Sequence, residues 1–305
     1  MQCYRHPDRE TRVSCSRCDR PICGDCMTPT SVGMRCPECS GDRTEVRRPT
    51  PSGGGFMGLQ EVGFWRAPAT FTLIGINVAV FVLQLATGGG AFSTESGTLI
   101  ENGALCGNAV GDLGGYCSPP LINVGGGELW RIITAGFLHG SLIHIALNMF
   151  VLYILGTMIE PAIGSPRTVA IYVVSLIAGS MGALLLADPA QNTVGASGAI
   201  YGLFAAAMVI AYDRGMTQML SQLGFWLLLN LLLTFSVSGI SIGGHLGGIV
   251  GGVIAGIVVV AGEKRSEGKR MVGIELAVLV GLAAAFFVGA VLVGDAASTG
   301  QHVRF

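Results

Sequence analysis

Two polar residues, Ser197 and His245, stand in strongly apolar stretches of this 305-residue chain. Ser197 lies in the run Gly-Ala-Ser-Gly at 195–198, and His245 lies in the run Gly-Gly-His-Leu at 243–246. Each residue opens a long apolar segment that carries almost no charge. A hydroxyl or an imidazole is unfavourable in lipid unless it has a partner or a function. The pair therefore predicts a nucleophile and its base inside a membrane.

The composition indicates a protein that crosses the bilayer several times. Half of the residues are hydrophobic and 12% are charged, with a mean hydropathy of +0.61. Soluble domains carry about 25% charged residues, so we expect the lipid bilayer to surround most of this chain. The net charge of -1 gives no bulk attraction to nucleic acid, and no nucleic acid is expected as a partner.

Seven apolar segments are each close to the ~20 residues that a helix needs to cross the hydrocarbon core. They lie at residues 69–87, 137–159, 168–187, 195–212, 219–237, 243–262 and 272–293. We predict an all-α polytopic membrane protein with a six-helix core over 68–262. The remainder, 263–305, is predicted to hold a cytoplasmic loop, a seventh C-terminal transmembrane helix and a short external tail. Residues 41–67 contain arginine, proline and glycine and are predicted to be a flexible basic linker.

Lysine and arginine set the expected orientation, because cytoplasmic segments carry an excess of both. Beyond residue 40, a cytoplasmic N-terminus leaves only Arg131 and Arg304 outside and places the others inside: Arg43, Arg47, Arg48, Arg66, Arg167, Arg214, Lys264, Arg265, Lys269 and Arg270. We expect a multi-pass protein of a prokaryotic plasma membrane with an external C-terminus. In this orientation the polar groups fall at similar depth near the outer face, namely Ser197, His245, His144 and Asn148.

Rows of small residues predict that the fourth and sixth spans pack against each other. Glycines recur every four residues at 244, 248, 252 and 256 on the sixth span, and Gly198, Gly202 and Ala206 do the same on the fourth. Such rows let helix backbones approach closely. Packing one row against the other would place His245 beside Ser197. Tyr201 is one turn from Ser197 on the same face and could stack on the imidazole.

These residues can perform acyl transfer. His245 can take the proton of the Ser197 hydroxyl, and no acidic residue at this depth offers a third member, so a dyad is predicted. His144 and Asn148 lie on one helix face and can donate N–H groups to the oxyanion, together with the Ser197 backbone amide at a helix N-terminus. The alternatives are a small packing residue at position 197 and an interhelical hydrogen bond from His245.

At these positions the sequence closely resembles the rhomboid family of intramembrane serine proteases. The matching motifs are Trp130-Arg131, His144-x3-Asn148, Gly195-Ala-Ser197-Gly198 with Tyr201, and Gly244-His245-x2-Gly248-x3-Gly252. The resemblance covers about 68–262 and implies Ser197 as nucleophile, His245 as general base, and His144, Asn148 and the Ser197 amide as the oxyanion site. It also implies that Tyr201 stacks on the histidine. The seventh span resembles the six-plus-one arrangement of some rhomboids.

Two further residues take expected roles beside this resemblance. Glu160 matches a family position thought to hold helices together, and an interfacial charge is the alternative. His139 is expected to be structural and to line a water-accessible cavity.

The predicted activity is hydrolysis of peptide bonds in or near transmembrane segments of membrane-anchored proteins, with no cofactor for catalysis. The resemblance implies that substrates enter laterally between helices. The main alternative is a catalytically silent rhomboid-like protein that binds transmembrane segments. Such proteins usually lack the serine or the histidine, whereas this chain has both. A transporter or channel is disfavoured because no carboxylate lies mid-span.

Residues 1–40 predict a small zinc-binding module. Four pairs with two-residue spacing supply eight ligands, enough for two tetrahedral ions: Cys3, His6, Cys15, Cys18, Cys23, Cys26, Cys36 and Cys39. The spacing resembles B-box and RING-like cross-braced folds, in which the first and third pairs share one ion and the second and fourth share the other. Adjacent-pair ribbons are the alternative, and a disulfide scaffold is disfavoured in the cytoplasm. An unknown cytoplasmic partner is expected.

The remaining cysteines, Cys106 and Cys117, lie in a long glycine-rich loop at 88–136 that is expected to be external. An oxidising location permits a disulfide between them. The alternative is two free thiols.

Overall fold

The computed structural model describes residues 1–30, 33–40, 63–92, 97–106, 124–186, 192–237, 239–265 and 269–298. The chain divides into two compact units, Met1–Gly55 and Phe56–Phe305. The division falls within the predicted linker at 41–67. Cys117 lies outside the described residues, and so does its predicted disulfide with Cys106.

The N-terminal unit is built from short elements. Strand β1 (Thr28–Thr30) pairs antiparallel with β2 (Gly33–Arg35), preceded by η1 (Gly24–Cys26) and followed by α1 (Pro37–Ser40). Its buried hydrophobic cluster consists of Ile22 and five of its cysteines. A core of this size is too small to stabilise a fold by burial alone, so an additional constraint such as bound metal is required.

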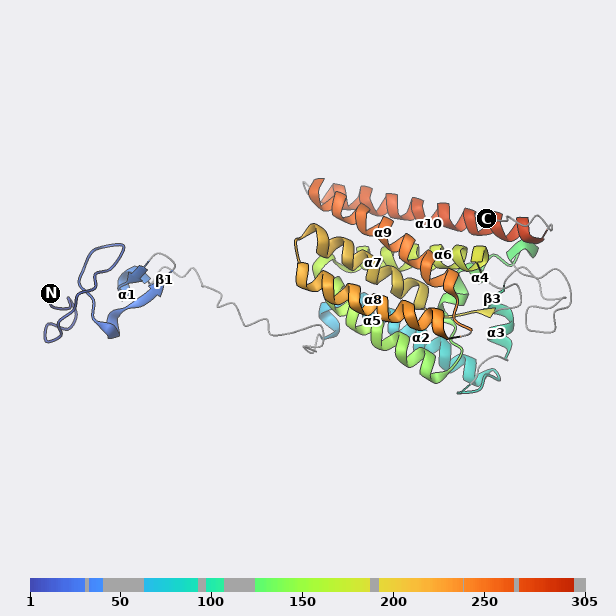
Figure 1. Ribbon diagram of the computed structural model, residues 1–305, viewed down its shortest axis with the longest axis horizontal. Helices are drawn as coiled ribbons and strands as arrows, with labels where there is room; N and C mark the ends of the chain where they lie inside the picture. The colour runs from blue at the N-terminus through green and yellow to red at the C-terminus, as the bar shows by residue number, and fades with distance from the viewer. Residues whose placement is uncertain are drawn as a thin grey trace. The chain divides into compact units, whose positions relative to one another are not determined.

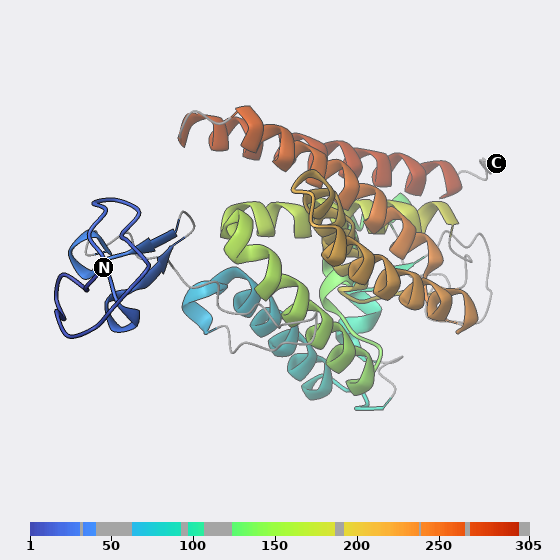
Figure 2. The same cartoon turned by 60° about the vertical axis from the view of Figure 1, so that its left-hand side comes forward.

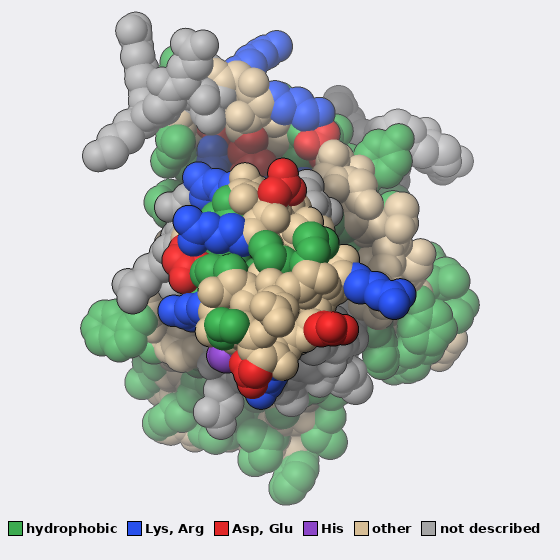
Figure 3. Space-filling model, turned by 90° about the vertical axis from the view of Figure 1, so that its left-hand side faces the viewer, with side chains coloured by type: hydrophobic (Ala, Val, Ile, Leu, Met, Phe, Trp, Pro, Cys, Tyr) green, Lys and Arg blue, Asp and Glu red, His purple; other side chains and the backbone are tan. Residues whose placement is uncertain are grey.

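The surface of the N-terminal unit carries charges of both signs. Arg5 pairs with Glu38 at 3.5 Å, Arg9 pairs with Asp25, and the Arg20 guanidinium lies over the ring of Tyr4. Figure 3 shows basic and acidic side chains interspersed on one face of this unit. The mixture gives no single-sign field.

The second unit is helical (Figure 1). Its long helices in the described residues are α2 (Pro68–Ala86), α5 (Leu142–Ile163), α6 (Ser165–Leu186), α7 (Ser197–Asp213), α8 (Thr217–Ser236), α9 (Ile242–Arg265) and α10 (Lys269–Ser298). Shorter elements connect them: η2 (Phe64–Arg66), α3 (Thr98–Gly103), β3 (Leu105–Cys106), η3 (Val124–Gly126), α4 (Arg131–Thr134), η4 (Ala135–Phe137) and β4 (Asn192–Thr193). The prediction of an all-α membrane protein with six core helices and a seventh C-terminal one is confirmed.

Helices α6, α7 and α9 form the centre of this unit. Helix α9 packs on both α6 and α7, α2 packs on α5, and α10 packs on α6. Figure 1 and Figure 2 both show α2 beside α5, with α10 along the opposite side of the unit. Nearly every residue of the first three turns of α7 is buried, as expected for a helix enclosed by its neighbours.

The predicted spans match the observed helices to within five residues at each end, and the largest differences are at the start of the second span and the end of the seventh. The second span was expected to begin at residue 137, but α5 begins at Leu142 because Ser141 forms its N-cap and accepts a hydrogen bond from the backbone N–H of His144 at 3.1 Å. Residues 131–137 form the short helices α4 and η4 instead. The sequence stays largely apolar across residue 141, so composition alone did not show where α5 begins.

Helix α7 is shorter than its neighbours. In the described part of the chain, the six other long helices are long and apolar enough to cross a membrane, whereas α7 has 17 residues. This length is roughly 25 Å, less than the ~30 Å hydrocarbon core. The end at Asp213, which pairs with Lys264, is polar and belongs at an interface. A helix of this length with Asp213 at one membrane surface would end at Ser197 before it reached the other surface.

The predicted glycine row of α9 does face α7. A Cβ atom added at Gly248 would overlap the backbone of Gly198, and one added at Gly252 would overlap the backbone of Gly202. Only hydrogen fits at these positions, so the two backbones are in direct contact. The prediction that these rows bring Ser197 and His245 together is confirmed.

A second row of glycines on α9 faces α6, and the sequence prediction did not include it. A Cβ atom at Gly243 would overlap Gly182, one at Gly247 would overlap Ala178, and one at Gly251 would lie 2.6 Å from the Cβ of Ala178. Because Gly243, Gly247 and Gly251 also recur every four residues, α9 presents bare backbone on two faces and fits between α6 and α7.

Glu160 joins two helices from a buried position. Its side chain accepts hydrogen bonds from the backbone N–H groups of Ala69 and Thr70, both at 2.8 Å, and from the hydroxyls of Thr70 and Ser165, both at 2.6 Å. The carboxylate thus satisfies free N–H groups at the start of α2, where negative charge is favoured. Glu160 is only 2% exposed, and these bonds confirm that it holds α5 and α2 together.

Replacing Glu160 with alanine should lower the free energy of unfolding by about 2–4 kcal/mol, because two N–H groups lose their acceptor. Glu263→Ala is the comparison, since that carboxylate is partly exposed and makes ion pairs with Arg214 at 3.1 Å and Arg167 at 3.7 Å but accepts from no free helix N–H in the described structure; it should cost about 1 kcal/mol. Thermal unfolding of both variants in one detergent measures the difference. Equal destabilisation would contradict the capping role of Glu160.

A buried arginine organises the loop that precedes α5. Arg131 is 1% exposed and donates to the Glu128 carboxylate and to the carbonyls of Ala104 and Glu101 at 2.6–2.8 Å. The ring N–H of Trp130 donates to the Asn102 carbonyl at 2.9 Å. The Trp130-Arg131 motif therefore fixes this loop through backbone carbonyls.

The seventh helix is attached by a buried ion pair. The Arg167 guanidinium makes two hydrogen bonds of 2.7 Å to the Glu275 carboxylate of α10. Both side chains are largely buried, at 14% and 2% exposed. Bidentate geometry fixes direction as well as distance, so α10 is held in one register against α6.

Candidate active site

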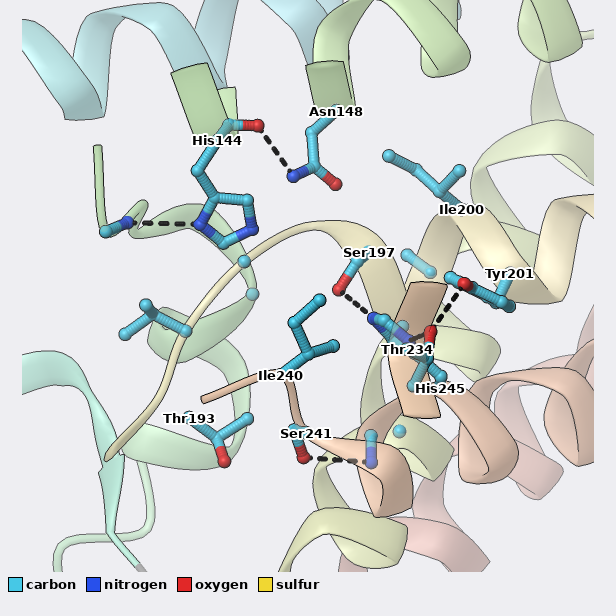
Figure 4. Close-up of a pocket in the computed structure, with 18 of the residues that line it drawn as sticks. His144, Asn148, Thr193, Ser197, Ile200, Tyr201, Thr234, Ile240, Ser241 and His245 are labelled. Atoms are coloured by element: carbon cyan, nitrogen blue, oxygen red, sulfur yellow. Dashed lines mark hydrogen bonds between the residues drawn. The ribbon is translucent and has the colours of Figure 1, made fainter. Parts of the chain in front are cut away.

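Ser197 and His245 meet at the N-terminal ends of α7 and α9. Ser197 is the first residue of α7, and His245 lies in the first turn of α9. The distance from Ser197 Oγ to His245 Nε2 is 2.8 Å, and Figure 4 shows the two side chains pointing toward one another. This is the distance at which an imidazole can take a hydroxyl proton.

A serine three or four residues before each histidine begins its helix. Ser141 accepts from the backbone N–H of His144 at 3.1 Å, and Ser241 accepts from the backbone N–H of Gly244 at 3.1 Å. Both are N-cap interactions. Helix α7, in contrast, has no side-chain cap, so the N–H groups around Ser197 remain available to a ligand.

The second nitrogen of His245 has a partner that the sequence did not reveal. His245 Nδ1 lies 2.8 Å from Thr234 Oγ1 on α8. Both residues are buried, at 7% and 3% exposed. A hydroxyl therefore lies beside the second nitrogen of the histidine, in the position that a carboxylate occupies in a Ser-His-Asp triad.

Tyr201 stacks on the imidazole, as predicted. The ring centroids of Tyr201 and His245 are 4.0 Å apart with planes inclined by 18°. The Tyr201 hydroxyl lies 2.9 Å from Thr234 Oγ1. Tyr201 thus restricts rotation of the histidine by contact with its face.

His144 and Asn148 project from α5 toward the space beside Ser197 (Figure 4). His144 Nδ1 accepts a hydrogen bond from the Gly140 backbone N–H at 3.2 Å. The proton of the neutral ring must then be on Nε2, which can donate. Asn148 donates one amide proton to the His144 carbonyl at 2.9 Å, and its second amide proton remains available.

Gly195 makes room for this arrangement. Its φ angle is +127°, and a Cβ there would lie 2.9 Å from Cε1 and Nε2 of His144 and 3.7 Å from Ser197 Oγ. Its N–H donates to the Ala135 carbonyl at 2.9 Å. Only glycine satisfies both the backbone angle and the close approach. His144 Nε2 is therefore held near the serine hydroxyl.

These side chains line a cavity of about 830 Å³ in the helical unit, namely Ser197, His245, His144, Asn148 and Tyr201. No Asp, Glu, Lys or Arg is among the described residues that line it. Charge that develops in the cavity must therefore be stabilised by neutral donors.

His139 does not line the cavity, so this part of the prediction is wrong. Its side chain is fully buried and packs edge-on against His144, with ring centroids 5.2 Å apart. Its backbone N–H and carbonyl both bond to the Gln84 side chain at 3.0 Å. These two hydrogen bonds to Gln84 of α2 hold the histidine with its ring directed inward, which confirms its structural role.

The N-terminal unit holds two clusters that can bind metal ions. Cys3, His6, Cys23 and Cys26 form one, and Cys15, Cys18, Cys36 and Cys39 form the other; within each, all the ligand atoms lie within 4.8 Å of one another. The first pair joins the third and the second joins the fourth. This grouping is cross-braced, and the alternative of adjacent pairs is not observed.

The distances inside the clusters suit tetrahedral zinc. Zinc–ligand bonds of about 2.0–2.3 Å at tetrahedral angles place neighbouring S and N atoms roughly 3.6 Å apart, and two S atoms roughly 3.8 Å apart. His6 Nδ1 lies 3.3, 3.4 and 3.9 Å from the sulfurs of Cys23, Cys26 and Cys3. The sulfurs of Cys18 and Cys36 are 3.7 Å apart, too far for a disulfide.

The sequence is similar to known proteins over the helical unit. The Rhomboid domain family model matches residues 126–262. Rhomboid protease GluP of Bacillus subtilis is 30% identical over 221 residues, which are 71% of this chain and 39% of that protein. RHOMBOID-like protein 5 of Arabidopsis thaliana is 39% identical over 83 residues, or 27% of each chain.

Rhomboid-related protein 3 of Homo sapiens is 34% identical over 79 residues, which are 26% of this chain and 19% of that protein. The chain thus spans less than half the length of these curated relatives. The region matched by the family model contains every residue described around Ser197 and His245, including Gly195. On this evidence the chain belongs to the rhomboid family.

Proposed function

We propose that this protein is an intramembrane serine endopeptidase that cleaves membrane-anchored proteins. The observation that carries the proposal is the 2.8 Å contact between Ser197 Oγ and His245 Nε2 in a cavity enclosed by apolar helices. A nucleophile needs a base at this distance. Membership in the rhomboid family supports the same reaction.

The proposed reaction begins with attack by Ser197 Oγ on the carbonyl carbon of the scissile peptide bond. His245 Nε2 takes the hydroxyl proton as the new C–O bond forms. The oxyanion of the tetrahedral intermediate accepts from His144 Nε2–H, Asn148 Nδ2–H and the Ser197 backbone N–H. His245 then gives its proton to the leaving amine, the C–N bond breaks, and the acyl-enzyme remains.

Hydrolysis of the acyl-enzyme repeats these roles with water as the nucleophile. His245 Nε2 takes a proton from water, the oxyanion forms again in the same site, and Ser197 leaves with the proton returned by His245. Water must therefore reach Ser197, which is half-buried in the cavity. The polar lining of the cavity, which includes His144 and Asn148, gives it a path.

The proposed substrate is a transmembrane segment with small residues and a weak helix near the cut. An intact helix hides its carbonyls in hydrogen bonds, so a helix that unwinds locally presents the bond to Ser197. Entry is proposed to be lateral, between helices. We also propose a prokaryotic plasma membrane location, with a cytoplasmic N-terminus and a cut near the outer face.

A catalytically silent protein that binds transmembrane segments is the second candidate. It would have no use for a hydrogen-bonded serine and histidine with adjacent oxyanion donors. A fluorophosphonate probe separates the two, because only an activated serine forms the adduct. We expect labelling of Ser197, located by peptide mass spectrometry, and none in His245→Ala. A native protein that resists the probe and leaves a membrane substrate uncut would favour the silent candidate.

We propose further that the N-terminal unit binds two structural zinc ions and presents a surface to a cytoplasmic partner. The support is the donor set and its spacing, which suit tetrahedral zinc. The small buried core requires such a constraint.

Metal analysis of the purified full chain should find about two zinc ions per molecule. Two double variants test the pairing. Removing Cys3 and Cys23 disrupts one cross-braced site and should leave up to one zinc, whereas removing Cys3 and Cys15 disrupts both and should leave none. Cys106→Ser, in the other unit, serves as the control. The reverse order of zinc contents would indicate adjacent-pair ribbons.

A further inference from the structure

We propose that Thr234 is a positioning residue that holds the His245 imidazole in the form able to take the Ser197 proton. The inference rests on the proposed function, since it assigns a supporting group to that base. Thr234 belongs to α8, which contributes none of the predicted catalytic residues. Thr234 also lines the cavity, and because its hydroxyl bonds to His245 Nδ1, we assign it an effect that acts through His245.

The hydroxyl of Thr234 is the meeting point of three hydrogen bonds. Its Oγ1 lies 2.8 Å from His245 Nδ1, 2.9 Å from the Tyr201 hydroxyl and 2.9 Å from the Asn230 carbonyl. Figure 4 shows Thr234 with His245 and Tyr201 around it.

One distribution of protons makes all three bonds. The Asn230 carbonyl has no proton, so Thr234 must donate its single proton there. Both of its lone pairs then accept, one from the Tyr201 hydroxyl and the other from His245 Nδ1–H. With the proton on Nδ1, His245 Nε2 is unprotonated and faces Ser197 Oγ at 2.8 Å. The local network thus selects the tautomer that general-base catalysis requires.

The placement of Thr234 distinguishes it from other hydroxyls in these helices. Thr157 on α5 also bonds to the carbonyl four residues earlier, at 2.6 Å, which is a common arrangement in apolar helices. Thr234 makes that bond and two more, and it is 3% exposed on a helix whose only other buried described residue is Leu223. Its hydroxyl is therefore directed at the histidine from an otherwise poorly buried helix.

Loss of the hydroxyl should affect the chemical step. Without an acceptor, the buried Nδ1–H of His245 is left unpaired, which is unfavourable. The imidazole then lowers its free energy by moving the proton to Nε2 or by rotating. Either change removes the acceptor for the Ser197 proton. Because Thr234 contacts no substrate atom in this scheme, KM should change little while kcat falls.

Two substitutions separate the hydroxyl from the shape of the side chain. Thr234→Val keeps the volume and removes the hydroxyl, whereas Thr234→Ser keeps the hydroxyl and removes a methyl. The full chain is reconstituted with a model transmembrane substrate. We expect Thr234→Val to lower kcat roughly 10- to 100-fold, and Thr234→Ser to keep most of the activity. Thr157→Val, the matched control, should behave like wild type.

The outcomes distinguish this inference from the proposed function. Full activity of Thr234→Val, with Ser197→Ala inactive, would overturn the role of Thr234 and leave the protease assignment intact. Equal losses in the valine and serine variants, with a lowered Tm, would overturn it in favour of packing. Cleavage by Ser197→Ala at the wild-type rate would overturn both. Loss in Thr234→Val, rescue by Thr234→Ser and an unchanged Tm support the inference.

Discussion

Replacement of Ser197 by alanine should reduce cleavage of a membrane-anchored substrate to the background of the assay, a loss of about 10⁴-fold or more. The hydroxyl oxygen forms the covalent bond in the proposed reaction, and among the described hydroxyls that line the cavity it is the one hydrogen-bonded to His245 Nε2. The Ser197 hydroxyl is also only half-buried, so its removal leaves no cavity that would destabilise the fold.

The measurement compares wild type, Ser197→Ala, His245→Ala and the double variant in proteoliposomes. Because the serine and histidine act as a unit, the double variant should be no less active than either single one. Ser221→Ala is the control, since its hydroxyl on α8 is exposed and bonds only to the Thr217 carbonyl in the described structure. Cleavage that persists in Ser197→Ala would remove the serine from the mechanism.

The encounter of Ser197 with His245 was predictable because each step left a signal in the sequence. Apolar length located the helices, and the excess of arginine and lysine on one side aligned their ends. Glycines every fourth residue showed which helix faces must touch. Their spacing is direct evidence of packing, because a Cβ atom has no room where two backbones meet.

No pattern in the sequence indicated that Thr234 contacts His245. A threonine in an apolar helix ordinarily bonds to its own backbone, as Thr157 does, and helical spacing alone gives no reason to direct it toward a histidine on another helix. The prediction for His139 was wrong for a related reason. A histidine near the site was expected to face water, but the side chain of Gln84 clasps its backbone and turns its ring inward. Both outcomes depend on tertiary contacts between distant segments.

The sequence likewise identified the zinc ligands but not the tertiary contacts that decide how they pair. Pairs with two-residue spacing identify the donors, because one turn presents both side chains. The spacing is the same for cross-braced and ribbon arrangements, so resemblance alone favoured the cross-braced form that the structure has. Pairing depends on contacts between distant segments, such as the hydrogen bond from the Tyr4 backbone N–H to the Pro21 carbonyl at 3.0 Å beside the first and third pairs, and the ligand spacing does not encode them.

Replacement of Gly252 by alanine should have the second largest effect, although it lies two turns from His245. A Cβ there would overlap the backbone oxygen and Cα of Gly202 on α7. Backbone atoms of two packed helices cannot turn aside as a side chain can, so α7 and α9 must separate by on the order of 1 Å. The cost in stability should be about 1–3 kcal/mol.

The separation also reaches the reacting atoms, because Ser197 and His245 are carried by these same two helices. A misplacement of about 1 Å can lower a rate roughly 100-fold, and we expect a loss of that order in substrate cleavage and in the labelling rate of Ser197. Gly281→Ala on α10 is the matched control, since a Cβ there meets nothing within 4 Å; it should be neutral or slightly stabilising. If Gly252→Ala matched Gly281→Ala in Tm and in cleavage, direct backbone contact would not be what holds the serine to its base.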